Sequence, residues 1–383
     1  MRRAKTEFMD FIRKIKLAAP EITSHQEQAI IEVLRSGNLV AGQQVRLFEK
    51  KLCQITHRKF AVMVSSGTAA LIAAMKALKT GRGSVVIVPA FTFPAPALAA
   101  HFLGARVVFC DVDPATLNMS VKTLMPHIDK NVSLVVPIDQ FGVPSPVDEI
   151  EEALKPYRIP VLVDAACSIG STLNKKPCGS LGKMAIFSFH PRKIITTAEG
   201  GAVLTDNETL AKNILRFRNI GMENGEFISS GINLRPSEMG AAMGLYQLNQ
   251  LDKIIKKRLD FGRRYKKLNV SFQKAPENTT VNNQTMAALL PAQVKENGRD
   301  NLRRYLADNG VESQVASYCI GLLPNLAKCF NTDYTQTPAA SMAHKFGIAL
   351  PLHNKLTNED IDYVVCLVEK WLHKFAAKPG GIL

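Results

Sequence analysis

Short apolar runs alternate with amphipathic stretches along the first two thirds of the chain. Each run is rich in valine, isoleucine or phenylalanine and stops at a small or polar residue, which is typical of a buried β-strand. The predicted strands span residues 60–64, 85–88, 106–110, 134–138, 161–164, 184–189 and 202–204. Because strands that alternate with helices form parallel sheets, we expect a mainly parallel seven-stranded sheet sandwiched by helices.

The segments before and between the strands carry apolar residues at helical spacing, as at Ala29, Ile30, Val33 and Leu34. Helices are predicted near residues 26–35, 44–55, 69–75, 95–103, 120–128 and 147–154, and from residue 208. A single long amphipathic helix, about residues 236–264, then leads to strand 286–290 and to helices near residues 299–309 and 358–376. We therefore predict an α/β fold: a large domain, residues 18–255, and a smaller α+β C-terminal domain, residues 256–383.

The first 17 residues form a basic segment with Phe8, Phe11, Ile12 and Ile15 at helical spacing. We interpret residues 1–17 as an amphipathic arm that packs its apolar stripe on the body or on a partner subunit. The last residues, 378–383, are expected to be a frayed tail. No apolar run approaches the roughly 20 residues that a membrane span requires, so no membrane span is expected.

Composition narrows the class of protein. A hydrophobic content of 46% is that of an ordinary globular protein, and seven scattered cysteines without a CxxC pair indicate a reducing, cytoplasmic location and no metal site. The net charge of +15 predicts attraction to anions. Part of it lies in two clusters, residues 253–258 and 263–267, which we interpret as solvated helix faces and not as a nucleic-acid site.

Candidate chemistry gathers where the predicted strands end. Ser65-Ser66-Gly67-Thr68 joins a strand to a helix, so its backbone N–H groups could bind a phosphate, although a plain helix cap has the same sequence. Asp164 ends one strand and could be a turn residue or the partner of a protonated ring nitrogen. Lys193, after Phe187-Ser188-Phe189-His190-Pro191-Arg192, is a surface charge or a desolvated amine for Schiff-base chemistry.

These residues are more informative together than singly. Neither GxxxxGK[ST] nor a GxGxxG after a strand occurs, so the usual signatures of nucleoside triphosphates, nicotinamide and flavin are missing. A phosphate-binding turn, an aromatic near Phe91-Thr92-Phe93, a strand-end aspartate and a late lysine are what pyridoxal 5'-phosphate requires. We therefore expect pyridoxal phosphate as the cofactor.

The chain resembles the DegT-type aminotransferases that act on nucleotide-linked sugars, pyridoxal-phosphate enzymes of the aspartate-aminotransferase (type I) fold. The motifs that carry the resemblance are Ser36-Gly37, Phe48-Glu49, Ser66-Gly67-Thr68-Ala69-Ala70-Leu71, Pro89-Ala90-Phe91-Thr92-Phe93, Asp111-Val112-Asp113-Pro114, Asp164-Ala165-Ala166, Phe187-Ser188-Phe189-His190-Pro191-Arg192-Lys193, Glu199-Gly200-Gly201, Gly231-Ile232-Asn233-Leu234-Arg235-Pro236-Ser237-Glu238 and Leu350-Pro351-Leu352-His353.

The resemblance implies a role for each matching residue. Lys193 forms the internal aldimine and moves the proton, Asp164 pairs with the pyridine nitrogen, and Phe93 stacks on the ring. Gly67, Thr68 and Ser188 hold the phosphate, as does Asn233 from the neighbouring subunit of a homodimer with shared active sites. The reaction implied is transfer of an amino group from an amino acid, typically glutamate, to a keto-sugar.

The chain departs from the family's pattern at several positions. Cys167 replaces the usual glutamine, histidine or glutamate near the phenolic oxygen of the cofactor, Asp139 replaces a frequent histidine, and Ala198 replaces a frequent glycine. Residues 317–320 lack the usual Pro-Leu-His after Tyr318, so the resemblance does not determine the identity of the substrate. The alternatives are a sugar dehydratase, against which the presence of Lys193 argues, a cyclitol aminotransferase, or a non-catalytic basic regulatory protein on the same fold.

Overall fold

The computed structural model describes residues 14–291, 293–294 and 297–376. Most of the predicted arm, residues 1–13, and the predicted tail, residues 378–383, lie outside the described residues. Ile15 is the described apolar member of the arm: it is buried, and its backbone N–H donates to the carbonyl of Gly310 at 2.8 Å. The end of the arm therefore packs on the body of the same chain.

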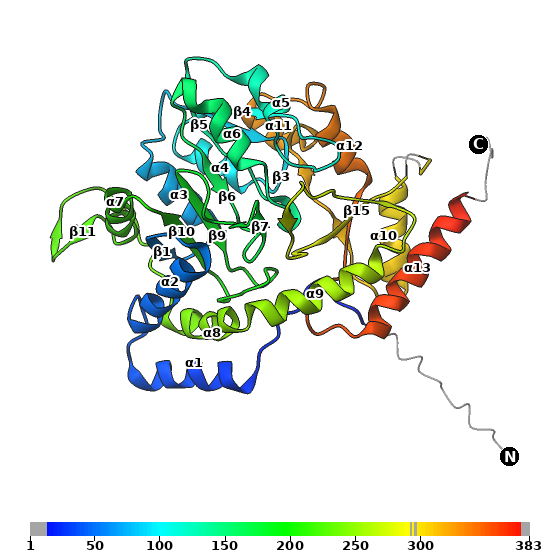
Figure 1. The fold of residues 1–383 in the computed structure, drawn as a ribbon, viewed down its shortest axis with the longest axis horizontal. Coiled ribbons are helices and arrows are strands. Elements are labelled where there is room, and N and C mark those ends of the chain that lie inside the picture. The colour runs from blue at the N-terminus through cyan, green and yellow to red at the C-terminus, as the bar shows by residue number, and fades with distance from the viewer. Residues whose placement is uncertain (1–13, 292, 295–296, 377–383) are drawn as a thin grey trace.

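The elements follow the predicted order closely (Figure 1). The α-helices are α1 (Ser24–Ser36), α2 (Gln43–Thr56), α3 (Gly67–Ala77), α4 (Ala95–Phe102), α5 (Val121–Leu124), α6 (Val147–Leu154), α7 (Glu208–Arg218), α8 (Glu238–Asn249), α9 (Leu251–Tyr265), α10 (Gly298–Asp308), α11 (Pro324–Phe330), α12 (Pro338–Phe346) and α13 (Asn358–Ala376). The strands are β1 (Phe60–Val64), β2 (Val85–Pro89), β3 (Phe91–Thr92), β4 (Arg106–Cys110), β5 (Val132–Val135), β6 (Leu162–Asp164), β7 (Thr172–Leu173), β8 (Lys176–Pro177), β9 (Met184–Ser188), β10 (Gly201–Thr205), β11 (Met222–Glu223), β12 (Glu226–Phe227), β13 (Ser271–Phe272), β14 (Thr279–Thr280), β15 (Met286–Leu289), β16 (Gln314–Val315), β17 (Tyr318–Cys319) and β18 (Gly347–Leu350).

The seven predicted strands of the large domain form two hydrogen-bonded sheets. One has the order β4-β2-β5 and is parallel, and the other has the order β1-β10-β9-β6. Strand β10 runs antiparallel to both of its neighbours, whereas β6 and β9 are parallel. Single parallel bridges, Val135 to Val161 and Ile138 to Asp164, connect the two sheets. The α/β class is confirmed, but one continuous seven-stranded ladder is not.

Strand residues pack alternately into two separate hydrophobic clusters, as the two-residue period of a strand requires. In β2, Val86 and Val88 belong to the cluster that contains α3 and α4, whereas Val85 and Ile87 belong to the cluster that contains α2, α6 and part of α8. Both faces of the sheets are therefore covered by helices, and this explains why the strands are apolar throughout instead of alternating.

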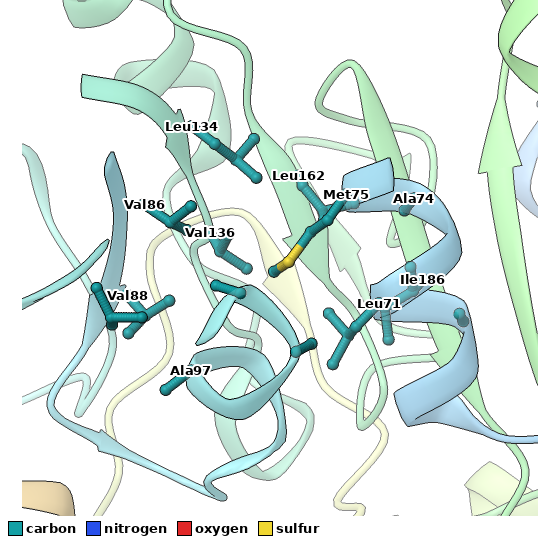
Figure 2. Close-up of a cluster of buried hydrophobic side chains, with 14 of the residues drawn as sticks. Leu71, Ala74, Met75, Val86, Val88, Ala97, Leu134, Val136, Leu162 and Ile186 are labelled. Atoms are coloured by element: carbon teal, nitrogen blue, oxygen red, sulfur yellow. The ribbon is translucent and has the colours of Figure 1, made fainter. Parts of the chain in front are cut away.

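Helix α3 is central to the first of these clusters. Figure 2 shows Leu71 and Met75 of α3 pointing toward Leu162 of β6 and Ile186 of β9, with Ala97 of α4 nearby. Its alanine-rich sequence gives α3 high helix propensity and allows close packing on the strands. The N-terminus of α3 is thereby held at the ends of β1, β6 and β9.

The predicted long helix is in fact two helices. Gln250, with φ −106° and ψ 10°, separates α8 from α9, so the prediction of one helix over residues 236–264 is wrong. The two helices pack on different partners: α8 lies against α1 and α2, and α9 against α13. The break lets the chain change direction between two hydrophobic clusters, which a continuous straight helix could not do (Figure 1).

The C-terminal part contains an antiparallel sheet of order β13-β15-β18-β16. Its apolar residues pack with α9, α10 and α13, for example through Tyr265, Leu306 and Val364. In the part of the chain that the structure describes, no helix combines the length and the apolar character needed to cross a membrane.

Candidate active site

The turn after β1 is a preformed helix N-terminus. Ser66 has extended backbone angles, and its hydroxyl accepts a hydrogen bond from the Ala69 N–H at 3.0 Å. Gly67 and Thr68 are the first two residues of α3, where backbone N–H groups have no partner within the helix. The sequence-based prediction of an N-cap at this position is confirmed, and the helix dipole favours an anion here.

Gly67 lies against the end of β9. A β-carbon on Gly67 would lie 2.7 Å from Cβ and 2.9 Å from Oγ of Ser188, so only glycine allows this approach. Gly201 shows the same restriction, because its β-carbon would lie 2.3 Å from the carbonyl oxygen of Ser66. The structure thus brings Gly67 and Ser188 into close contact, so the N-terminus of α3 and the residue at the end of β9 can face the same ligand, as the predicted phosphate site requires.

Asp164 is the last residue of β6, and its carboxylate is buried with 6% exposure. Its Oδ1 accepts a hydrogen bond from the Ala166 N–H at 3.0 Å. Burial raises the pKa of Asp164, while this hydrogen bond and the positive charge of Lys193 act in the opposite direction. Without a cationic partner a carboxylate at this depth is costly, so Asp164 is suited to bind a positively charged group.

Lys193 lies in the loop between β9 and β10, and its Nζ is 3.0 Å from Sγ of Cys167. Both side chains are partly buried. Cys167 follows β6, and Lys193 follows β9, which is paired with β6 in parallel. Because parallel neighbours end at the same edge, Asp164 and Lys193 meet there as the sequence predicted, and Cys167 lies beside Lys193.

Phe93 and Asn233 are not brought to this cluster by any contact within the described chain. Phe93 is 66% exposed just before α4, whereas its neighbour Phe91 is fully buried and packs edge-on against Phe141. The Asn233 side chain is also exposed, and its Oδ1 accepts a hydrogen bond from the Arg235 N–H at 3.2 Å. Both residues present their side chains outward.

The loop that carries Lys193, between β9 and β10, is held by two glutamines. Neither of them was identified from the sequence. The side chain of the buried Gln284 accepts a hydrogen bond from the Ile194 N–H at 2.9 Å and donates one to the Arg192 carbonyl at 2.7 Å. It therefore fixes the backbone on both sides of Lys193. Gln247 of α8 does the same at Thr196, with two bonds of 3.0 Å. A glutamine 90 residues away leaves no local signal, so no pattern in the sequence could have shown this pairing.

Asp139 is a third residue of this region that was missed as a site residue, since it was noted only as a departure from the family's pattern. It is buried; its Oδ2 accepts from the Ser168 hydroxyl at 2.6 Å and its Oδ1 from the Ser145 N–H at 2.8 Å. Its own N–H donates to the carbonyl of Asp164 at 3.0 Å. Burial raises the pKa of Asp139 to about 7, against the effect of its hydrogen bonds. Asp139 therefore supports the backbone that positions Asp164.

A doubly covered α/β sheet whose edge brings together a partly buried lysine, a buried carboxylate and a helix N-terminus has the arrangement expected of a pyridoxal-phosphate aminotransferase. The sequence model of the DegT/DnrJ/EryC1/StrS aminotransferase family matches residues 20–369. The chain belongs to this family, and the resemblance found in the sequence is confirmed.

Individual relatives cover almost the whole chain. The GDP-perosamine synthase of Escherichia coli O157:H7 is 31% identical over 359 residues, which are 92% of this chain and 97% of the relative. The PMP-form structure of the putative sugar aminotransferase Spr1654 from Streptococcus pneumoniae superposes with a TM-score of 0.90 at 25% identity, covering 95% of this chain and 99% of that one. PseC of Helicobacter pylori, an aminotransferase involved in pseudoaminic acid biosynthesis, gives a TM-score of 0.87 at 25% identity and covers 94% and 100%.

Proposed function

We propose that this chain moves an amino group from glutamate to the keto group of a nucleotide-linked sugar. The protein is a pyridoxal-phosphate-dependent sugar aminotransferase, as its family and its relatives indicate. The nucleotide is inferred from relatives such as the GDP-perosamine synthases. The observation that carries the proposal is the position of Lys193 Nζ beside Cys167, at the edge that holds Asp164 and the N-terminus of α3.

The side chains present fit pyridoxal phosphate. The N-terminus of α3 at Gly67 and Thr68, with Ser188 directly beside it, suits its phosphate, and the buried Asp164 suits its protonated ring nitrogen. The exposed ring of Phe93 is free to lie against a flat ligand. When bound, the cofactor supplies an electron sink for the electrons of the bond that is broken beside the transferred nitrogen.

Lys193 is the residue to which we assign the chemistry. Its Nζ is partly buried and oriented, because Gln284 fixes the backbone on both sides of it. An amine held in this way can bind the cofactor covalently and can take a proton from substrate carbon and return it. Asp164 keeps the ring nitrogen protonated through its negative charge.

Replacement of Lys193 tests the assignment. Lys193→Ala is expected to lower kcat by at least about a hundredfold and to abolish the fixation of cofactor by borohydride, measured by mass spectrometry of the intact chain. Lys183→Ala, at an exposed lysine before the other end of β9, is the control and should behave as wild type. Cofactor still fixed at its normal site in Lys193→Ala would show that another residue holds it.

The substrate is tested with a panel. Purified holoenzyme is incubated with glutamate and a series of nucleotide keto-sugars, and the aminated product is detected by mass. Strong activity on a cyclitol ketone with none on any sugar would redirect the substrate class, and loss of water from a sugar without amination would indicate a dehydratase. A colourless protein that takes up no cofactor and binds DNA with a steep salt dependence would favour a regulatory protein.

We infer a cytoplasmic homodimer in which Asn233 completes the cofactor site of the partner subunit. The exposure of Asn233 and Phe93 supports this, since neither contacts the Lys193 cluster of its own chain. Co-expression of Lys193→Ala and Asn233→Ala chains with different tags is the test. Inactive parents should yield a mixture with about a quarter of wild-type activity, because half of its dimers are hybrids and each hybrid has one intact site of two. Hybrids as inactive as the parents would contradict shared sites.

We also propose the domain division 18–255 and 256–383, with residues 1–17 as an arm. The two sheets of the large domain would then act as one mainly parallel seven-stranded layer, joined through the bridges at Val135 and Ile138. The boundary falls within α9, a continuous helix that links the two domains. Limited proteolysis should therefore cut first within the arm; first cuts inside the predicted domains would contradict the division.

A further inference from the structure

A cavity of about 410 Å³ lies between the segment before α1, helix α9 and the loop that carries Lys193. Its lining includes Pro20, Arg192, Gln250 and Asn354. Lys193 itself lines it, whereas none of the residues assigned to the cofactor's phosphate or ring nitrogen does. Its size is within the range of small-molecule sites, and its walls come from four separate stretches of the chain.

The lining of this cavity carries surplus positive charge from α9. Lys253, Lys256, Lys257 and Arg258 all line it. They belong to the cluster that the sequence predicted to be a solvated helix face, and for Arg258 that prediction is wrong. Arg258 is 4% exposed and donates to the carbonyls of residues 283 and 284.

The lysines of the cluster also differ from one another. Lys257 Nζ donates to the carbonyl of Asn354 at 2.5 Å. Lys253 and Lys256 have no ion pair or hydrogen bond to any described residue. They are three residues apart, so they are neighbours on the surface of α9. Of the two acidic residues in the lining, Asp260 is already paired with Arg263 at 2.6 Å. Two unpaired ammonium groups beside a cavity favour an anionic ligand.

His353 provides an independent indication of a ligand. It lines the same cavity with only 7% exposure, and its Nε2 is hydrogen-bonded to the carbonyl of Lys16 at 3.1 Å. Because that bond needs a hydrogen on Nε2, Nδ1 is an acceptor, and it has no partner among the described residues. Burial lowers the pKa of His353 to about 4, so the ring is neutral near pH 7. A buried acceptor of this kind requires a donor such as a hydroxyl group.

We propose that this cavity binds a phosphorylated sugar, whose phosphate pairs with Lys253 and Lys256 and whose hydroxyl group donates to Nδ1 of His353. A phosphate ester with free sugar hydroxyls satisfies both the cations and the acceptor, whereas a simple anion satisfies only the cations. Free sugar phosphates and nucleotides share this chemistry. Lys193 also lines the cavity, so the site adjoins the proposed cofactor site. The proposal rests on the lysines of α9 and on His353, and it does not depend on the proposed reaction.

Titration calorimetry of the holoenzyme tests the proposal, since bound pyridoxal phosphate fills its own phosphate site. The probes are ribose 5-phosphate, GMP and inorganic phosphate. Lys253→Gln with Lys256→Gln should weaken the binding of all three by about tenfold. The matched control is Lys266→Gln with Lys267→Gln, which removes the same charge from exposed positions of the second basic cluster and should leave binding unchanged.

His353→Gln separates the two halves of the proposal. Glutamine can still donate to the Lys16 carbonyl but has no acceptor at the position of Nδ1. His353→Gln should weaken the binding of ribose 5-phosphate or GMP by several-fold and leave the binding of inorganic phosphate unchanged. The comparison requires that the thermal unfolding of the variant matches that of wild type. The tighter of the two sugar probes identifies the source of the ligand. No binding to wild type, or equal loss in both double variants, would overturn the proposal and indicate only general attraction to a basic surface.

Discussion

Lys193 Nζ lies 3.0 Å from Sγ of Cys167, so the amine assigned to the chemistry has a thiol as its nearest polar neighbour. A thiol is a weak donor and a weak acceptor, and it holds an amine less firmly than an amide or carboxylate does. This contact sets the chain apart from the family's usual pattern of glutamine, histidine or glutamate at the same position. It also makes Cys167 the first residue to vary.

Cys167→Gln is expected to tighten cofactor binding by several-fold, because an amide donates a stronger hydrogen bond to the cofactor's oxygen than a thiol does. Spectrophotometric titration of the apoenzyme measures the dissociation constant, and the absorption maximum of the bound cofactor should shift. Cys167→Ala, which removes the contact without adding a donor, is the matched comparison and should bind slightly more weakly than wild type. Identical spectra and affinities in all three proteins would show that residue 167 does not face the cofactor.

Gln284→Leu should lower the free energy of unfolding by about 2–4 kcal/mol, because it leaves the Ile194 N–H and the Arg192 carbonyl without their buried partner. The loop would also lose its hold on Lys193, so kcat should fall more than the KM of either substrate changes. Urea denaturation and steady-state kinetics measure the two effects. Gln284→Glu keeps the acceptor for the Ile194 N–H, so its free energy of unfolding and its kcat should lie between those of wild type and Gln284→Leu. A normal kcat in Gln284→Leu would mean that Gln247 alone holds the loop.

Ala198→Gly is expected to stabilise the protein by about 0.5–1 kcal/mol, because Ala198 has a φ of +65° that disfavours any residue with a β-carbon. The midpoint of urea denaturation measures the gain. Ala327→Gly, in the interior of α11, is the control with the opposite sign and should cost about 1 kcal/mol. A loss of stability at position 198 would contradict the strain inferred there.

Asp139 should make stability fall as the pH rises. Its pKa is about 7 in the folded chain against 3.8 in the unfolded chain, so the folded state binds the proton more tightly. Its contribution is therefore fully present below about pH 4 and is lost as the pH rises through 7, by an amount of the order of 2–4 kcal/mol.

Asp139→Asn removes this titration and keeps an acceptor for the Ser145 N–H. The stability difference between wild type and Asp139→Asn, measured by urea denaturation from pH 4.5 to pH 7.5, should change steadily in favour of the variant. A constant difference over that range would show that Asp139 does not titrate there. Groups that titrate in both proteins cancel in the comparison.

Much of the fold follows from local sequence. Strands such as β1 and β4 and helices such as α6 and α13 lie where the pattern of apolar residues predicted them, because burial on one or both faces imposes a period that the sequence must carry. The break at Gln250 was missed, since the apolar residues on either side of it continue at helical spacing while the two helices pack on different clusters. Packing partners, not local pattern, decide such a break.

The sequence by itself identified the residues to which we assign the chemistry. Lys193, Asp164, Ser188 and the turn at Gly67 follow strands or open a helix, and their order along the chain already predicted a common edge. Only the tertiary structure decided what surrounds them. Cys167 contacts Lys193, and Gln284 forms hydrogen bonds to the loop that carries Lys193. Packing also leaves Nδ1 of the buried His353 without a partner among the described residues. The first two contacts join residues far apart in the chain. Such contacts depend on how distant segments pack, and packing leaves no periodic trace in either segment.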